Sequence, residues 1–363
     1  MVKWDSSNRK IIAYQRLRFF IQEVALAFII IFIFLLTLLL ESIFIEENTV
    51  IYGIIFYVLR AIIILFGIPL SLYLSNLIFE SQKRNKLIVE EDISPAKGHL
   101  RLYSMTKKNY KYQILYGLLI FFLVFLPLDF FTYLLIPEMI EYHAWAFTLK
   151  STDGYLILNN YFLFLISAII IQVSVSFAEE TISRGFLTKR GSEHFLKTSA
   201  VMISALYFGL GHFAYFIDQQ RIEAAAGRTF PFWFPFLWFT QAFILGLILS
   251  LLILRRKWLF PVILAHALNN IISTHTIWNF IQGGNFKVVA FHIYLPLLII
   301  GLALLVWQFP KIKEGVSIGL KMIKPYFEND EKLEKTKGDK LFRIFIDVIV
   351  GILISLLGTL ILI

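Results

Sequence analysis

Glu179 and Glu180 are adjacent acidic residues at the end of a long apolar run, Leu156 to Ala178, and Arg184 follows them within about one helical turn. Ionisable groups at membrane depth are costly, and they usually face the interior of the protein or a wet cavity. A carboxylate in such a place can serve as a general base that takes a proton from water. The pair therefore marks a candidate site of hydrolysis or proton transfer.

The residues that follow this pair separate the roles of the two acids. Residues four apart lie on the same face of a helix, so Glu180 lies beside Arg184, and Glu179 lies beside Ser183. Glu180 and Arg184 are natural partners for an intrahelical ion pair. This pairing leaves Glu179 as the acid that is free to react.

A second apolar stretch carries His212, within the sequence Phe208-Gly209-Leu210-Gly211-His212. The two glycines allow the backbone of another helix to approach closely beside the imidazole. We therefore expect a buried and closely packed histidine at this position.

A third apolar stretch carries His266 and, four residues later, Asn270, so their side chains project from one helix face. Asn269 points about 100° away from that face. His275, nine residues after His266, falls on the opposite face. We expect neither Asn269 nor His275 to join the cluster.

An acid, two imidazoles and a carboxamide are the groups that a hydrolytic site requires. Any one of them also has a purely structural alternative, because polar side chains form hydrogen bonds between helices within a membrane. We expect such structural roles for other polar residues, among them His143 in a loop and the isolated intramembrane residues Arg60, Asp129 and Asp347. Arg60 and Asp129 are candidates for an ion pair with each other.

The elements that must position these groups are membrane helices. The chain has 363 residues, of which 58% are hydrophobic and 16% are charged, and its mean hydropathy is +0.74. Soluble domains have roughly 45 to 50% apolar residues. Apolar runs of about 20 residues recur without the alternation of barrel strands, which indicates an all-α fold, a polytopic bundle of about eight to nine transmembrane helices. The absence of cysteine excludes disulfides and thiolate chemistry.

Basic residues predict the orientation of this bundle. The candidate spans lie near residues 24–41, 50–78, 113–136, 156–187, 198–217, 232–254, 258–280, 288–308 and 343–362. Lys and Arg precede the first span and follow every even-numbered span, whereas the loops after odd-numbered spans contain few of them, which places the N-terminus in the cytoplasm. The basic residues include Lys3, Lys83, Arg84 and Lys86. The net charge of +9 is then a signal of membrane topology, and we expect contact with the lipid bilayer and no binding of nucleic acid.

The same pattern divides the chain into segments. We expect a basic cytoplasmic N-terminus (1–23), a transmembrane domain (24–308) whose polar core lies at about 156–280, a charged cytoplasmic loop (309–341) and a C-terminal transmembrane helix (342–363). Glu179 can reach the depth of His212 only if the fourth helix continues to about Leu187, which moves Glu179 inward by roughly 12 Å. We predict that continuation, together with a cavity that opens to the cytoplasm.

Read together, the motifs Glu179-Glu180-x-x-x-Arg184, Phe208-x-x-x-His212 and His266-x-x-x-Asn270 resemble those of the CPBP intramembrane proteases. This is the family of the type II CAAX prenyl endopeptidases and of the bacteriocin-immunity-type homologues, also called the Abi family. All three motifs are complete, and they lie within residues 179 to 270. The resemblance implies an endopeptidase of a bacterial cytoplasmic membrane that cleaves membrane-associated proteins or peptides, including lipidated ones.

The resemblance also implies roles for individual residues. Glu179 is implied as the catalytic acid, His212 as its partner in activating water, and His266 with Asn270 as stabilisers of the oxyanion. Glu180, Arg184 and Phe208 are implied as supporting residues. Peptide hydrolysis needs a deprotonated water, a proton for the leaving amine and donors for the oxyanion, which these side chains can supply without a cofactor.

Two alternatives remain beside this interpretation. Glu179, His212 and His266 could instead hold a zinc ion that activates the water, although the chain contains no His-Glu-x-x-His segment. We favour the metal-free mechanism. The other alternative is a non-proteolytic membrane scaffold or a bacteriocin-immunity-type factor that keeps the fold and binds a partner protein.

Overall fold

The computed structural model describes residues 6–79, 94–328, 333–334 and 336–361 of the chain. Every element assigned within these residues is a helix, which confirms the predicted all-α fold. Four of the basic residues used to predict the orientation, Lys3, Lys83, Arg84 and Lys86, lie outside the described residues.

The helices run in chain order as follows, with η marking π-helical and 3-10 segments. They are α1 (Ser6–Phe19), η1 (Phe20–Ala25), α2 (Leu26–Leu35), η2 (Leu36–Leu40), α3 (Glu41–Phe44), α4 (Val50–Phe79), α6 (Pro95–Leu100), η3 (Arg101–Tyr103), α7 (Tyr110–Ile120), η4 (Phe121–Phe125), α8 (Leu126–Leu135), α9 (Glu138–Thr148), η5 (Ser151–Ile157), α10 (Tyr161–Glu180), η6 (Thr181–Arg190), α11 (Gly191–His194), α12 (Lys197–Phe213), η7 (Ala214–Phe216), α13 (Gln219–Ala226), α14 (Phe234–Arg256), α15 (Phe260–Ile281), α16 (Phe286–Val289), η8 (Ala290–Tyr294), α17 (Leu295–Ile323), η9 (Lys324–Tyr326), α18 (Lys337–Gly358) and η10 (Thr359–Ile361).

Within the described ranges, eight helical stretches are long and apolar enough to cross a membrane. They are Asn8–Leu38, Val50–Phe79, Tyr110–Leu135, Tyr161–His194, Lys197–Phe216, Phe234–Arg256, Phe286–Tyr326 and Lys337–Ile361. The remaining predicted span corresponds to α15, which has 22 residues but is less apolar because it carries His266 and several other polar residues. The protein is therefore an integral membrane protein, as predicted.

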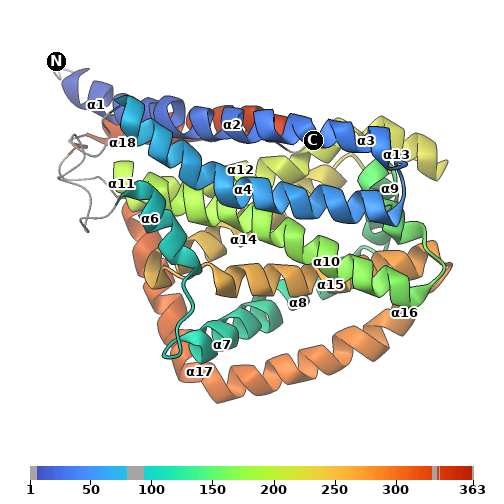
Figure 1. Cartoon of the computed structure of the whole chain (residues 1–363). Helices are drawn as coiled ribbons and strands as arrows, with labels where there is room; N and C mark the ends of the chain where they lie inside the picture. Colours follow the sequence, from blue (N-terminus) through green and yellow to red (C-terminus); the bar gives the residue numbers. More distant parts are fainter. Residues whose placement is uncertain (1–5, 80–93, 329–332, 335, 362–363) are drawn as a thin grey trace.

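The helices that carry the three motifs lie at the centre of the bundle. α10 packs against α15 and α4, and α12 packs against α14 and α18. α1, α6 and α11 gather at one end of the bundle, whereas α3, α9, α13 and α16 lie at the other end (Figure 1). The loops after even-numbered and odd-numbered spans are thus segregated to opposite ends, as an alternating topology requires.

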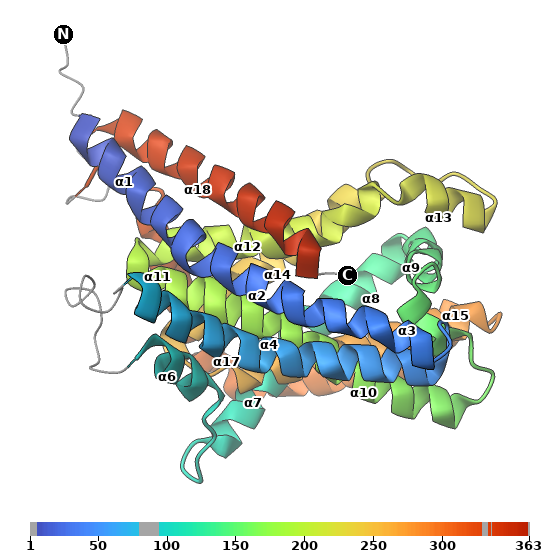
Figure 2. The same cartoon turned by 45° about the horizontal axis from the view of Figure 1, so that its top comes forward.

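The first helix begins much earlier than the predicted span, at Ser6. It runs beside α18, as both views of the bundle show (Figures 1 and 2). Arg16 and Asp347 form an ion pair of 3.0 Å between these helices, and both side chains are almost completely buried. Hence part of the predicted basic N-terminus, 1–23, is a packed helix, and Asp347 has the structural role expected of it.

The predicted loop 309–341 is shorter than expected. α17 continues to Ile323, and α18 begins at Lys337 behind a capping box formed by Thr336 and Asp339. The charged residues of the continuation lie on its exposed side, and Lys and Glu are good helix formers. The change from apolar to charged residues near residue 309 therefore marks the end of the apolar span but not the end of α17.

The fourth span continues past the acidic pair, as predicted. α10 is followed without interruption by the π-helical segment η6 and by α11, which gives one helical stretch of 34 residues, Tyr161–His194. Glu179 lies close to the middle of this stretch. π-helical turns inside α-helices are often found at functional sites.

Candidate active site

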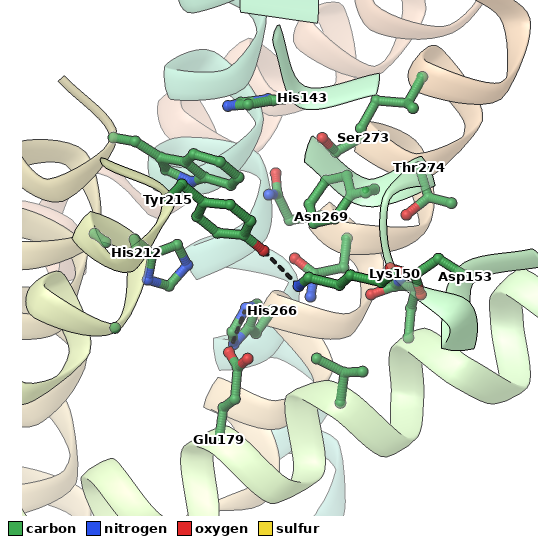
Figure 3. Close-up of a pocket in the computed structure, with 18 of the residues that line it drawn as sticks. His143, Lys150, Asp153, Glu179, His212, Tyr215, His266, Asn269, Ser273 and Thr274 are labelled. Atoms are coloured by element: carbon green, nitrogen blue, oxygen red, sulfur yellow. Dashed lines mark hydrogen bonds and ion pairs between the residues drawn. The ribbon is translucent and has the colours of Figure 1, made fainter. Parts of the chain in front are cut away.

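A cavity of about 640 Å³ lies among α4, α10, α12, α14 and α15. The predicted residues Glu179, Phe208, His212, His266 and Asn270 all line it. Figure 3 shows Glu179, His212 and His266 pointing into this space from three different helices. The structure therefore brings the three sequence motifs together, although they are far apart in the chain.

Glu180 and Arg184 lie behind the cavity wall and are completely buried. Arg184 Nε is 3.1 Å from Glu180 Oε2, so the predicted ion pair is present. The other carboxylate oxygen, Glu180 Oε1, accepts a hydrogen bond of 2.8 Å from Nδ1 of His266. Glu180 thus links the first motif to the third and orients the imidazole of His266.

The opposite edge of the same imidazole faces Glu179. His266 Nε2 is 3.7 Å from Glu179 Oε2, and the side chain of Glu179 is 28% exposed, whereas that of Glu180 is inaccessible. The two acids are therefore different in kind: one is buried behind His266 and the other is open to the cavity. The close neighbour of Glu179 is His266, and not His212 as we expected.

His212 is held by its own helix. Its Nδ1 lies 2.9 Å from the backbone oxygen of Phe208. A carbonyl can only accept, so Nδ1 carries the proton, and Nε2 of the neutral ring is left as an acceptor. The ring packs between Phe208 and Trp238, at centroid distances of 4.8 and 5.7 Å.

Phe208 is the aromatic residue against which the motif residues pack. The guanidinium carbon of Arg184 lies 4.1 Å from the centroid of the Phe208 ring, which is a cation–π contact. The edge of His266 meets the same ring at a centroid distance of 5.9 Å. On its other side, His266 stacks on Phe125 at 5.5 Å.

Asn270 lies one turn beyond His266 and its Nδ2 donates to Ser176 Oγ at 3.4 Å. Asn269 also lines the cavity and is buried, so the prediction that it stays outside the cluster was wrong. The cavity is wide enough to cover an arc of α15 that includes both amides. His275 is not among the lining residues, in agreement with the prediction.

Two further predictions of purely structural roles need correction. His143 does not lie in a loop but in α9, and it lines the cavity, where its Nδ1 is 3.1 Å from the hydroxyl of Tyr133. Arg60 and Asp129 also line the cavity. They do not form the expected ion pair with each other within the described part of the chain. Neither position could be predicted from the sequence, because the spatial neighbours of Arg60 and Asp129 come from other helices.

Residues of the loops that follow the third and the fifth spans also line the cavity. They include Lys150 and Asp153, before α10 (Figure 3), and Asp218, after η7. None of the described residues of the even-numbered loops lines it. The expected opening toward the basic, even-numbered loops is therefore wrong, because the cavity lies nearer to the other end of the bundle.

Lys150 and Asp153 form the polar end of this cavity, outside the membrane-spanning stretches. Lys150 Nζ donates to the hydroxyl of Tyr215 at 2.6 Å, and the hydroxyl of Tyr57 donates to Asp153 Oδ1 at 3.0 Å. Burial raises the pKa of Asp153 to about 6, against the opposing effects of Lys150 and Tyr57. Burial acts to lower the pKa of Lys150, but Tyr215 and Asp153 outweigh it, so this pKa lies above its usual value.

The donor atoms do not converge on a metal position. Among the described residues, no group of three or more His, Asp or Glu side chains is arranged to hold a metal ion. Glu179, His212 and His266 are suitable ligands by type, but they would have to move toward one another to bind one ion.

Comparison with known proteins covers the same three motifs. Residues 161–272 match the family model of the type II CAAX prenyl endopeptidase Rce1-like proteins. No curated protein and no solved structure gives a significant match. The matched segment extends from the start of α10 into α15, so it contains every motif residue that lines or supports the cavity. This segment is thus similar to the CAAX-type intramembrane proteases, the family that the three motifs resemble.

Proposed function

We propose that this protein is an intramembrane endopeptidase in which Glu179 activates water for the hydrolysis of a peptide bond. The observation that carries the proposal is the pairing of an accessible carboxylate with an imidazole at 3.7 Å in a cavity within the bundle. The buried position of Glu180 favours Glu179 as the reacting acid. The substrates we propose are membrane-associated proteins or peptides, including lipidated ones.

In the first step, Glu179 takes a proton from a water molecule, and the oxygen of that water attacks the carbonyl carbon of the substrate. The Nε2 atom of His212 accepts the second hydrogen bond of the water and so fixes its orientation, because Nδ1 is already committed to Phe208. In the second step, the carbon–nitrogen bond breaks and Glu179 returns the proton to the leaving amine. General acid–base catalysis of this kind contributes about 10²- to 10⁴-fold.

The developing oxyanion needs donors that are already in place. We assign this role to Nε2 of His266 and Nδ2 of Asn270, both on the cavity face of α15. Because Nδ1 of His266 already donates to Glu180, donation from Nε2 requires a ring that is protonated on both nitrogens. Glu180 and Glu179, on either side of the ring, balance its positive charge.

The test compares the wild type with Glu179→Ala and His212→Ala in cells. New peptide N-termini are labelled in the membrane fraction and identified, which also reveals the substrate. We expect the wild-type cleavage products to disappear in both variants. Unchanged products in both variants would contradict the enzymatic proposal and favour the scaffold or immunity-type alternative.

The metal alternative has a separate test on the purified protein. Cleavage of the identified substrate is measured in lipid vesicles before and after treatment with a strong chelator. We expect activity to be retained. Loss of activity that returns on addition of zinc would replace the glutamate mechanism by a metal-dependent one.

A further inference from the structure

Lys150 places a positive charge in the cavity from outside the family segment. It precedes η5, and its exposed side chain lines the cavity. Besides its hydrogen bond to Tyr215, its ammonium lies over the rings of Tyr215 and Phe147, at 4.9 and 5.4 Å. These contacts hold the cation in one place without neutralising it.

Arg60 is a second cation that lines the same cavity, and no acid among the described residues pairs with it. The residue is 8% exposed, and its buried Nε makes no hydrogen bond with the described residues. No ion pair joins its guanidinium to an acid within the described ranges. An unpaired buried charge in a membrane helix is strongly unfavourable. A ligand that supplies an anion beside Arg60 would offset this cost.

The fold holds the two cations in a fixed relation to each other. Tyr57, one turn before Arg60 on α4, donates a hydrogen bond to Asp153 and lies 3.1 Å from the hydroxyl of Thr152. Gly53 of α4 packs so closely on this loop that a Cβ atom would lie 2.2 Å from the carbonyl oxygen of Thr152. The loop that presents Lys150 is thus fixed against the helix that presents Arg60, and both side chains line the same cavity.

The local charges leave this end of the cavity positive. Lys150 and Arg60 contribute two positive charges and Asp153 one negative charge, which leaves one positive charge. The other acids that line the cavity have neighbours elsewhere. Glu179 and Asp129 lie near His266, and Asp218 pairs with Arg221 at 3.2 Å.

This end of the cavity is connected to the proposed catalytic residues. Arg60, Tyr207 and Glu179 all line this one cavity. His212 and Lys150 line it too. One peptide can therefore contact the cations with an anionic group while its backbone passes Glu179.

We propose that Lys150 and Arg60 form a subsite that binds a carboxylate of the peptide substrate. The inference rests on the proposed peptidase function and adds a determinant of its specificity. Carboxylates are the anionic groups of an unmodified peptide, and a guanidinium binds them through two parallel hydrogen bonds. The carboxylate comes from either the C-terminus or an acidic side chain.

The first experiment measures binding without cleavage. The full-length protein in lipid nanodiscs is titrated with N-acetyl-leucine and with its neutral analogue, N-acetyl-leucinamide. N-acetyl-aspartic acid α-amide, which has only a side-chain carboxylate, is the third probe. We expect at least one acid to bind about tenfold or more tightly than the neutral analogue, and the tighter acid identifies the source of the carboxylate. Equal affinity for all three would overturn the proposal.

Variants then assign the effect to the two cations. We expect Lys150→Met and Arg60→Met each to weaken binding of the preferred acid by about tenfold to a hundredfold, with no effect on the neutral analogue. Lys150→Arg keeps the charge and is expected to retain most of the affinity, which distinguishes a binding role from a structural one. Lys287→Met removes an exposed cation that does not line the cavity and serves as the matched control. An unchanged preference in Lys150→Met would refute the subsite.

The same probes separate this inference from the proposed function. Carboxylate binding is also measured in Glu179→Gln, which keeps both cations. We expect Glu179→Gln to bind the carboxylate like the wild type but not to cleave, whereas a wild-type protein that binds the carboxylate and cleaves no substrate would refute the peptidase proposal and leave the subsite intact. Cleavage without any carboxylate preference would refute the subsite and leave the peptidase proposal intact.

Discussion

The ion pair between Arg184 and Glu180 supports a prediction about stability. Both side chains are completely buried, with Nε and Oε2 at 3.1 Å. Arg184→Met removes the cation and leaves a buried carboxylate whose remaining partner is His266. Breaking a buried pair in this way costs about 3 to 5 kcal/mol. Since His266 still donates to Glu180, we expect a loss of unfolding free energy near the lower limit, about 3 kcal/mol.

The matched control is Lys189→Met. Lys189 and Glu193 form an ion pair of 2.9 Å on the same helical stretch, but their side chains are 21% and 26% exposed. Such pairs contribute about 0 to 1 kcal/mol. The double variant Glu180→Gln/Arg184→Met removes the stranded charge and should recover part of the loss.

The assay is reversible unfolding of the full-length protein in mixed micelles with increasing denaturing detergent. We expect the loss of unfolding free energy for Arg184→Met to be at least about 2 kcal/mol greater than that for Lys189→Met. If Arg184→Met and Lys189→Met lose the same unfolding free energy, the buried ion pair between Arg184 and Glu180 does not stabilise the protein in the way we propose.

Three other predictions concern the fold, its pH dependence and its orientation. Burial lowers the pKa of His99 to about 4, so the stability that its neutral form provides is present above pH 6.5 and is lost as the pH falls through 4. The loss reaches about 3 kcal/mol, and His99→Gln should reduce it in unfolding curves measured between pH 7 and 4. Gly154→Ala should destabilise the protein by at least about 1 to 3 kcal/mol, because a Cβ atom there would lie 2.0 Å from the carbonyl oxygen of Asn48; unfolding at the wild-type detergent concentration would contradict this packing. The chain contains no cysteine, so an impermeant maleimide should label Arg221→Cys in intact cells and Lys197→Cys only after the membrane is opened; the reverse pattern would show the opposite orientation.

The sequence was sufficient to predict the helices and the identity of the motif residues. Continuous apolar runs revealed the spans, and the spacing of four residues between Glu180 and Arg184 predicted their ion pair, which the structure contains. The need for Glu179 to reach the depth of the other motifs predicted the continuation of the fourth helix. These features depend on local periodicity or on a constraint of length, which a single sequence contains.

The arrangement of the side chains across helices was not predictable in the same way. Glu179 faces His266 more closely than His212, and Asn269 faces the cavity together with Asn270. Both outcomes depend on the rotation of α15 relative to α10 and on the width of the cavity, which no local pattern records. Lys150 was missed because a single lysine in a loop carries no signal until the fold places it beside Tyr215.

The central claim is that Glu179 takes the proton from water, and the most direct measurement replaces its carboxylate by an amide. Glu179→Gln keeps the size and hydrogen-bonding capacity of the side chain but cannot accept that proton. It is compared with the wild type and with Glu193→Gln, whose side chain lies outside the cavity, on the identified substrate in lipid vesicles at saturating concentration. We expect kcat to fall by about 10²- to 10⁴-fold in Glu179→Gln, while its substrate binding and the kcat of Glu193→Gln stay close to those of the wild type. A kcat for Glu179→Gln within about threefold of the wild type, far smaller than the expected effect of losing a general base, would contradict it.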